Sequence, residues 1–182
     1  KNKLRCELEV IPCDNYNHDS LYSLPVRPSP NLKSDQAIAL YPSLCFFEGT
    51  PISVGRGTKQ PFTIYGHPNI EGNLKFTPQP ILGAKNPKLN GIECNGYDLT
   101  EFKIPLKKLE LGWLIDAYEQ YPDKSNYFNS FFNLLAGNKT LQEQIIAGYK
   151  VEEIRSSWSN NLKAFKSIRK KYLLYPDFND NQ

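Results

Sequence analysis

The chain has 182 residues, enough for one substantial hydrophobic core and, at about 150 residues per domain, for a single domain over residues 1–182. Hydrophobic residues make up 40% and charged residues 23%, near the averages for globular proteins, which argues against disordered and membrane-spanning classes. The 22 basic and 19 acidic residues nearly cancel, and the net charge of +3 does not indicate a nucleic-acid partner.

The first part of the chain predicts extended segments and one short helix. Residues 4–11 alternate between apolar and charged side chains, which is the period of a half-buried strand. The stretch LYSLPVRPSPNL, residues 21–32, holds three prolines, and these favour an extended backbone rigid enough to frame a groove. A helix is expected over residues 34–40, because Ser34 can cap its start and Pro42 would end it.

Four more short extended segments are predicted, over residues 44–47, 62–65, 75–82 and 92–99. A loop rich in Gly, Asn, Pro and Lys separates the last two. If residues 44–47 form a buried strand, the glycine-rich stretch that follows lies at its C-terminal end, where α/β proteins usually place their ligands.

Apolar residues spaced by three and four predict four helices in the second half, over residues 106–121, 128–135, 140–148 and 151–172. The last has a core-facing apolar stripe, glutamates at its start and lysines and arginines at its end, as the helix dipole favours. Strands followed by helices indicate an α+β fold: a small mixed or antiparallel sheet followed by a cluster of C-terminal helices packed on it.

No metal site and no cofactor is expected. The four cysteines form no CxxC pair and have no histidine at zinc-finger spacing. Cys45 and Cys94 lie in apolar stretches, which suits buried free thiols. The sequence leaves open whether Cys45 or Cys94 is oxidised.

The most unusual motif is FFEGTPISVGRGT, residues 46–58. Its glycines let a ligand approach the backbone, its threonines offer hydroxyls, and the planar fork of Arg56 suits a carboxylate or a phosphate. The motif lacks the GxxxxGK-S/T order of a phosphate-binding P-loop. Two interpretations stay open: Arg56 pairs with Glu48 and pins the loop, or Arg56 binds an anion.

Two further residues are candidates for acid–base chemistry. Glu48 follows an apolar run, but a hydrolytic site needs a second carboxylate about 5 to 9.5 Å away. His67, in YGHP, suits either an acid–base group or a sugar contact, although a lone histidine before proline is more often a hydrogen-bonded loop residue.

Several of these motifs together resemble the C-terminal half of the bacterial exo-β-N-acetylmuramidases, a family long catalogued as of unknown function. The resemblance runs from about residue 4 to residue 175, and its most specific block is FEGT, GRGT and PF within residues 47–62. It also includes LPVRPSPNL, YGHP, EIRSSW and IRKKYLLY.

The resemblance implies a two-part, secreted or periplasmic glycoside hydrolase of cell-wall recycling that releases N-acetylmuramic acid from non-reducing ends of peptidoglycan. An N-terminal Rossmann-like domain, absent from this chain, would carry the presumed catalytic glutamate and form the substrate cleft together with this one. The expected partners are therefore muramyl sugars and the missing domain, with neither nucleic acid nor a transmembrane segment, and the chain alone is expected to be inactive. The alternative is a non-catalytic domain that binds peptidoglycan or only braces its partner.

The resemblance also implies site residues. Glu48 is expected in a supporting catalytic role, and the expected substrate-binding residues are Arg56, Thr50, Gly57, Thr58, Asn31 and His67. N-acetylmuramic acid bears a lactyl carboxylate that N-acetylglucosamine lacks, and a guanidinium fork discriminates well between the two sugars. Arg56 is therefore expected to bind this carboxylate.

Overall fold

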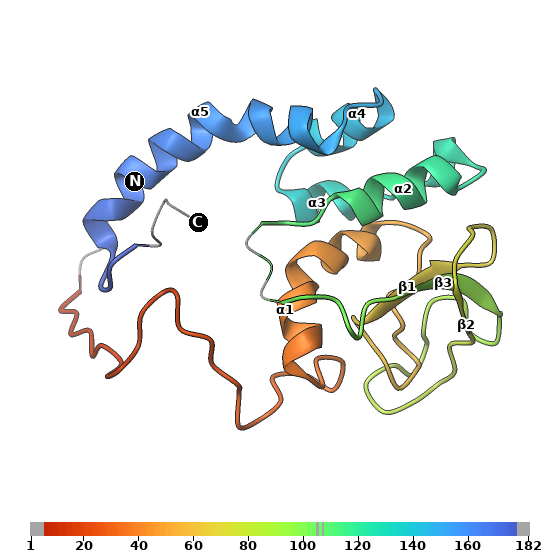
Figure 1. Ribbon diagram of the computed structural model, residues 1–182, viewed down its shortest axis with the longest axis horizontal. Coiled ribbons are helices and arrows are strands. Elements are labelled where there is room, and N and C mark those ends of the chain that lie inside the picture. The colour runs from red at the N-terminus through yellow and green to blue at the C-terminus, as the bar shows by residue number, and fades with distance from the viewer. Residues whose placement is uncertain (1–5, 105, 107, 178–182) are drawn as a thin grey trace. The chain divides into compact units, whose positions relative to one another are not determined.

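The computed structural model describes residues 6–104, 106 and 108–177, and it divides the chain into two compact units (Figure 1). The larger unit is Ser23–Ser156, and the smaller combines the two ends, Lys1–Tyr22 and Ser157–Gln182. The elements, in chain order, are α1 (Asp35–Leu44), η1 (Cys45–Gly49), β1 (Ile64–His67), β2 (Leu74–Phe76), β3 (Cys94–Asp98), α2 (Gly112–Gln120), η2 (Lys124–Asn126), α3 (Phe132–Ala136), α4 (Thr140–Ile146), α5 (Val151–Arg169) and η3 (Lys170–Tyr172). Here η denotes a short 3₁₀ helix.

The sheet has three antiparallel strands in the order β1-β3-β2, and the α+β prediction is confirmed. Gly66 of β1 faces Gly96 of β3, so the two strands approach closely at this pair. On its other side Gly66 exchanges two backbone hydrogen bonds of 2.9 Å with Ser53. The glycine-rich loop is thereby attached to the edge of the sheet.

The turn that carries Glu48 is fixed by packing on both sides. The ring of Phe47 stacks on Tyr65 of β1, with 4.9 Å between the ring centroids. Gly49 lies against the backbone of Phe132 in α3, where a Cβ atom at Gly49 would come within 2.6 Å of the Phe132 Cα. Aromatic burial and close backbone contact therefore hold η1 between the sheet and α3.

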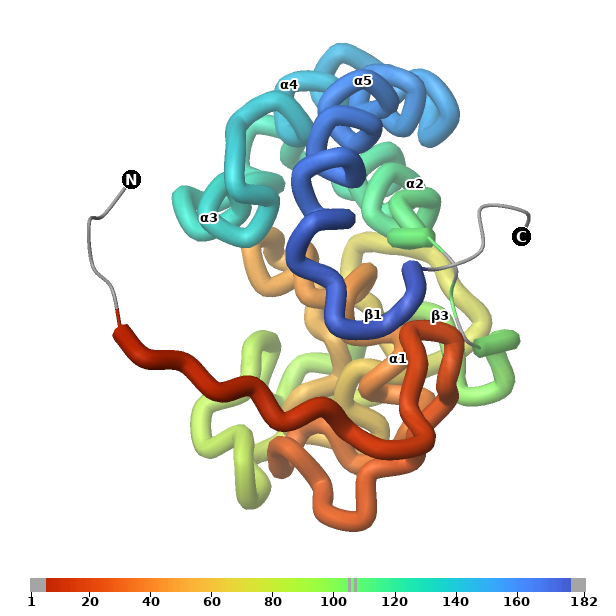
Figure 2. The backbone as a smooth tube through the Cα atoms, turned by 90° about the vertical axis from the view of Figure 1, so that its left-hand side faces the viewer, coloured from red at the N-terminus to blue at the C-terminus, as the bar shows by residue number. Residues whose placement is uncertain are grey.

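Two predicted strands are wrong. Residues 6–11 form no strand and are exposed along an extended trace (Figure 2), and residues 4 and 5 lie outside the described part of the chain. Residues 44–47 belong to the end of α1 and to η1, because the fully buried Leu40, Leu44 and Phe47 recur at helical spacing. That burial also carries α1 through Pro42, so the predicted end of the helix was wrong as well.

The other elements were predicted in kind, with different ends. β2 stops at Phe76 rather than residue 82, because Pro78 and Pro80 cannot donate to the sheet. The four C-terminal helices are confirmed, although α2 begins at Gly112 rather than at residue 106, and residue 107 lies outside the described part of the chain. Gly137 ends α3 in the left-handed conformation. In α5, however, Ile154 is buried whereas Leu162, Phe165 and Ile168 are exposed, so the core-facing prediction fails for these three residues.

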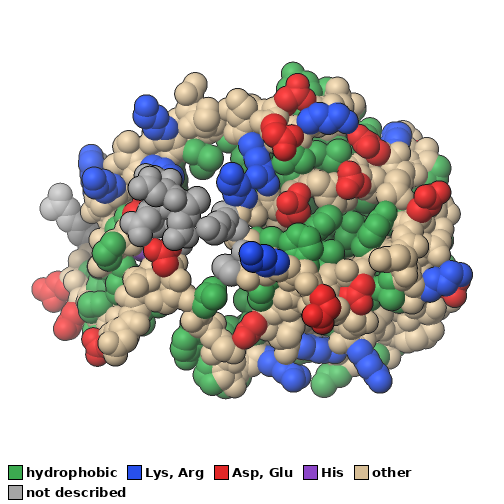
Figure 3. Space-filling model, viewed as in Figure 1, with side chains coloured by type: hydrophobic (Ala, Val, Ile, Leu, Met, Phe, Trp, Pro, Cys, Tyr) green, Lys and Arg blue, Asp and Glu red, His purple; other side chains and the backbone are tan. Residues whose placement is uncertain are grey.

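Within the described residues no helix is long and apolar enough to cross a membrane. On the face that Figure 3 shows, lysine and arginine side chains lie among aspartates and glutamates, as the balanced composition leads one to expect. The described cysteines Cys6, Cys13, Cys45 and Cys94 are free thiols.

Candidate functional site

The glycine-rich loop and the loop between β2 and β3 enclose a cavity of about 290 Å³ in the larger unit. The cavity is lined by Glu48, Ser53, Val54, Arg56, Gly83, Ala84, Lys85, Asn86, Pro87 and Lys88. Glu48 is the one carboxylate among these residues. Two of the predicted site residues, Glu48 and Arg56, therefore meet at one concave surface.

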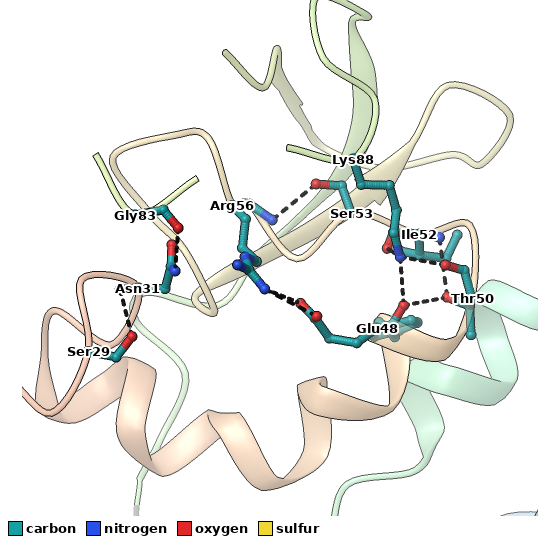
Figure 4. A network of polar contacts seen from close by, with 11 residues as sticks. Ser29, Asn31, Glu48, Thr50, Ile52, Ser53, Arg56, Gly83 and Lys88 are labelled. Atoms are coloured by element: carbon teal, nitrogen blue, oxygen red, sulfur yellow. Dashed lines mark hydrogen bonds and ion pairs between the residues drawn. The ribbon is translucent and has the colours of Figure 1, made fainter. Parts of the chain in front are cut away.

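Glu48 and Arg56 form an ion pair at this cavity (Figure 4). The Nη1 group of Arg56 donates to both carboxylate oxygens of Glu48, at 3.3 and 3.2 Å. The side chains stay 40% and 29% exposed, respectively, so solvent and ligands can reach the pair. The pairing interpretation of the sequence is thus correct, and it leaves the anion-binding interpretation open.

The ion pair engages only one of the three guanidinium nitrogens. Among the described residues, Nε and Nη2 of Arg56 have no hydrogen-bond partner. These two nitrogens form one edge of the guanidinium and donate in parallel, which is the geometry that binds a carboxylate through both of its oxygens. The pair therefore orients Arg56 and leaves a bidentate edge available to an anion.

Gly57 brings the two cavity walls together. Its φ of +88° is one that glycine adopts without strain, and a Cβ atom there would come within 2.6 Å of the Pro87 side chain. Its carbonyl accepts a hydrogen bond of 2.8 Å from the backbone N–H of Gln79. Gly57 is therefore a packing residue between the walls, and it does not line the cavity itself.

Lys88 was not predicted, and it makes the densest set of contacts at the site. Its ammonium donates to the carbonyls of Phe47, Thr50 and Ile52 at 3.0, 2.5 and 3.0 Å. Burial lowers the pKa of Lys88 to about 8; the Glu48 carboxylate opposes that shift and Arg56 adds to it. The sequence carried no signal for this residue, because its partners are main-chain atoms 36 to 41 positions away.

Three other predicted site residues shape the walls without lining the cavity. Thr50 is buried, and its hydroxyl donates to Phe47 O and accepts from Ile52 N–H. The hydroxyl of Thr58 closes a similar turn, donating to Gly55 O at 2.7 Å. Asn31 donates to Gly83 O at 2.9 Å and so braces the opposite wall. Their direct contact with substrate stays a prediction.

His67 is not among the cavity-lining residues. It lies at the end of β1, is buried, and packs edge-on against Tyr121 with 5.0 Å between the ring centroids. Its Nδ1 accepts the backbone N–H of Asn69, which places the proton of the neutral ring on Nε2. Burial, and next the charge of Lys88, lower the pKa of His67. These contacts fit the interpretation of His67 as a hydrogen-bonded structural residue. A contact between His67 and substrate stays a prediction.

This arrangement can bind an anion, but its described lining residues include one carboxylate, where most glycoside hydrolases use two. In the described part of the chain, no three His, Cys, Asp or Glu side chains gather as a metal site would require. The cavity is positive in sum, because Arg56, Lys85 and Lys88 outnumber Glu48.

Comparison with known proteins gives consistent matches. A family model described as exo-beta-N-acetylmuramidase NamZ, C-terminal, matches residues 39–175. The peptidoglycan beta-N-acetylmuramidase NamZ of Bacillus subtilis is 32% identical over 166 residues, which is 82% of this chain and 40% of that protein. The chain is thus similar in sequence to the C-terminal part of longer proteins.

Two solved structures of DUF1343 family proteins from Bacteroides fragilis are also similar. The first is 46% identical with a TM-score of 0.91, covering 95% of this chain and 50% of its own. The second, 16% identical with a TM-score of 0.59, covers 83% of this chain and 45% of its own and supports the fold alone.

The chain therefore spans between 40% and 50% of the length of these relatives. The matched residues 39–175 include both cavity walls, and the resemblance seen in the sequence is confirmed. This chain belongs to the exo-β-N-acetylmuramidase NamZ family, of which it matches the C-terminal domain.

Proposed function

We propose that this chain is the cleft-forming, C-terminal part of a peptidoglycan-degrading glycoside hydrolase that releases N-acetylmuramic acid from non-reducing ends. The observation that carries the proposal is the free Nε–Nη2 edge of Arg56 at a positively charged cavity. Family membership supplies the substrate class. Action on peptidoglycan would place the protein outside the cytoplasm, secreted or periplasmic, and in cell-wall recycling.

Arg56 would recognise the lactyl carboxylate of N-acetylmuramic acid. Its two free N–H groups match the two carboxylate oxygens, while Glu48 holds the guanidinium in place from the other side. N-acetylglucosamine lacks this carboxylate, so it would leave the edge unpaired and bind more weakly. A cavity of about 290 Å³ is at the small end for ligand sites and suits one terminal sugar rather than a length of glycan.

The same site argues that the chain does not hydrolyse alone. Both oxygens of Glu48 accept hydrogen bonds from Arg56, so its role would be to orient the arginine. The second carboxylate required by hydrolysis would come from the N-terminal domain of the family, which would close the cleft. Mixing this chain with that domain should produce turnover that neither part has alone.

The binding part of the proposal is tested by calorimetric titration of the 182-residue chain with N-acetylmuramic acid and with N-acetylglucosamine. The chain should prefer the muramyl sugar, with affinity of at least about millimolar strength. Charge-assisted hydrogen bonds contribute about 1.5–3 kcal/mol, so Arg56→Ala should weaken muramyl binding by roughly 10- to 150-fold and remove the preference. The matched control is Arg27→Ala, at an exposed arginine outside the cavity. The proposal would be refuted if the unaltered chain bound the two sugars equally, or if Arg56→Ala bound the muramyl sugar as tightly as the unaltered chain does.

A non-catalytic binding domain is the second candidate, favoured by the single carboxylate of the cavity. It predicts the same sugar preference but no gain of turnover when the N-terminal domain is added. The mixing experiment therefore separates the two functions.

A further inference from the structure

We propose that Lys88 is the positioning residue of this site, whose ammonium group holds the segment Phe47–Ile52 in the conformation that directs Glu48 at Arg56. The inference rests on the proposed function in one respect, namely that the ligand carries a carboxylate. Its geometric basis, however, is independent of the ligand (Figure 4).

The number and direction of the contacts fit an ammonium ion. A lysine ammonium has three N–H donors and no acceptor, and here the three donors meet three carbonyl oxygens. Those carbonyls belong to Phe47, Thr50 and Ile52, which flank Glu48 in the chain. The polypeptide is thus gathered around the ammonium, and the direction of the intervening Glu48 follows from that turn.

Two of these carbonyls depend on Lys88. The carbonyl of Phe47 also accepts the N–H and the hydroxyl of Thr50. The carbonyls of Thr50 and Ile52 have no other donor among the described residues, and both residues are buried. Without the ammonium, the carbonyl oxygens of Thr50 and Ile52 would be buried with no hydrogen-bond donor. We therefore expect the segment to rearrange until these oxygens reach water.

Lys88 also connects the two walls of the cavity. It stands at the end of the lining stretch 83–88, whereas its acceptors belong to the wall that carries Glu48 and Arg56. An arginine could supply the same charge, but its planar fork cannot direct three donors at three oxygens grouped around one point. Charge attraction and positioning therefore make different predictions for Lys88→Arg.

The protonation of Lys88 gives a second readout. The charged and titratable groups that act on or respond to its charge are Glu48, Arg56 and His67, and Lys85 lines the same cavity. The lowered pKa of His67 leaves its ring neutral in the alkaline range. Because burial lowers the pKa of Lys88 to about 8, its third donor is lost as the pH rises through that value. Affinity for a carboxylate should therefore fall on this alkaline limb.

The experiment measures affinity for N-acetylmuramic acid from about pH 6.5 to about pH 9.5 in the 182-residue chain and in Lys88→Met, Lys88→Arg and Lys75→Met. The last is the control, since Lys75 pairs with Glu93 at the surface away from the cavity. The unaltered chain and the control should lose about tenfold in affinity as the pH rises through about 8, whereas both Lys88 variants should bind about tenfold more weakly at about pH 6.5, with a flat profile that the unaltered chain approaches at alkaline pH.

The results separate failure of this inference from failure of the proposed function. If Arg56→Ala binds as the unaltered chain does, the function is wrong. If Arg56→Ala loses affinity while Lys88→Arg keeps it with the alkaline limb intact, the function stands and Lys88 acts at most through its charge, which overturns the inference. Should Lys88→Met fail to fold by circular dichroism, the unaltered chain still decides, because a flat profile through pH 8 contradicts the inference.

Discussion

The contact of Gly57 with Pro87 makes a stability prediction for Gly57→Ala that separates two physical effects. An alanine at a φ of +88° lies in the left-handed region, which costs about 1–2 kcal/mol. The added Cβ would also come within 2.6 and 2.7 Å of two Pro87 side-chain atoms and within 2.8 Å of the Gln79 carbonyl oxygen. The overpacking, with the shifts that it forces on neighbouring atoms, typically destabilises the fold by about 1–3 kcal/mol more. The free energy of unfolding should therefore fall by about 2–5 kcal/mol.

Gly91→Ala is the matched control. Gly91 also has a positive φ, of +74°, but a Cβ there would meet no atom within 4 Å. Gly91→Ala should therefore lower the free energy of unfolding only through the strained backbone conformation. Urea unfolding of both variants, followed by circular dichroism, gives the difference, which should be about 1–3 kcal/mol in favour of Gly91→Ala. If both variants lost the same free energy of unfolding, Gly57 would not be in close contact with Pro87. The two cavity walls would then not be packed together as described.

Two further predictions follow from neighbouring residues. Asn31→Ala removes the hydrogen bond to Gly83 O, so it should lower the free energy of unfolding by about 1 kcal/mol and weaken muramyl binding by less than Arg56→Ala does; a larger effect on binding than that of Arg56→Ala would indicate direct contact with substrate. His67 has a lowered pKa in the folded chain, so the unfolded chain takes up its proton first; urea midpoints should fall as the pH drops below about 6.5, and His67→Gln should flatten that dependence. An unchanged slope in His67→Gln would assign the acid sensitivity to other groups.

The helices of the second half could be predicted because each carries its own periodic pattern. Gly137, which follows the apolar stripe of residues 128–135, ends α3 in the left-handed conformation. The four apolar residues 44–47 could not be assigned in this way, since so short a run fits a strand or a buried helical turn equally. Their conformation is decided by contacts with Tyr65 and Phe132, which lie 18 or more positions further along the chain.

The candidate site likewise contains residues that the sequence indicated and residues that it did not. Glu48 and Arg56 are eight positions apart in a glycine-rich loop, so the sequence indicated that they could meet. The opposite wall, residues 83–88, was assigned only as a loop, because nothing in its composition shows which segment it faces. Contacts made through main-chain carbonyls leave no side-chain pattern, and for that reason Lys88 was missed.

The geometry of Glu48 bears on how work would be shared between the two parts of the family's proteins. Both of its oxygens accept from Nη1 of Arg56, so protonation of Glu48, which a general acid requires, would weaken the contact that orients the arginine. A site that kept both roles on one carboxylate would release its hold on the substrate carboxylate as it reacted. Under the proposed function, separation of the roles would avoid this conflict: Glu48 and Lys88 would fix the arginine edge, and proton transfer would fall to a carboxyl of the N-terminal domain.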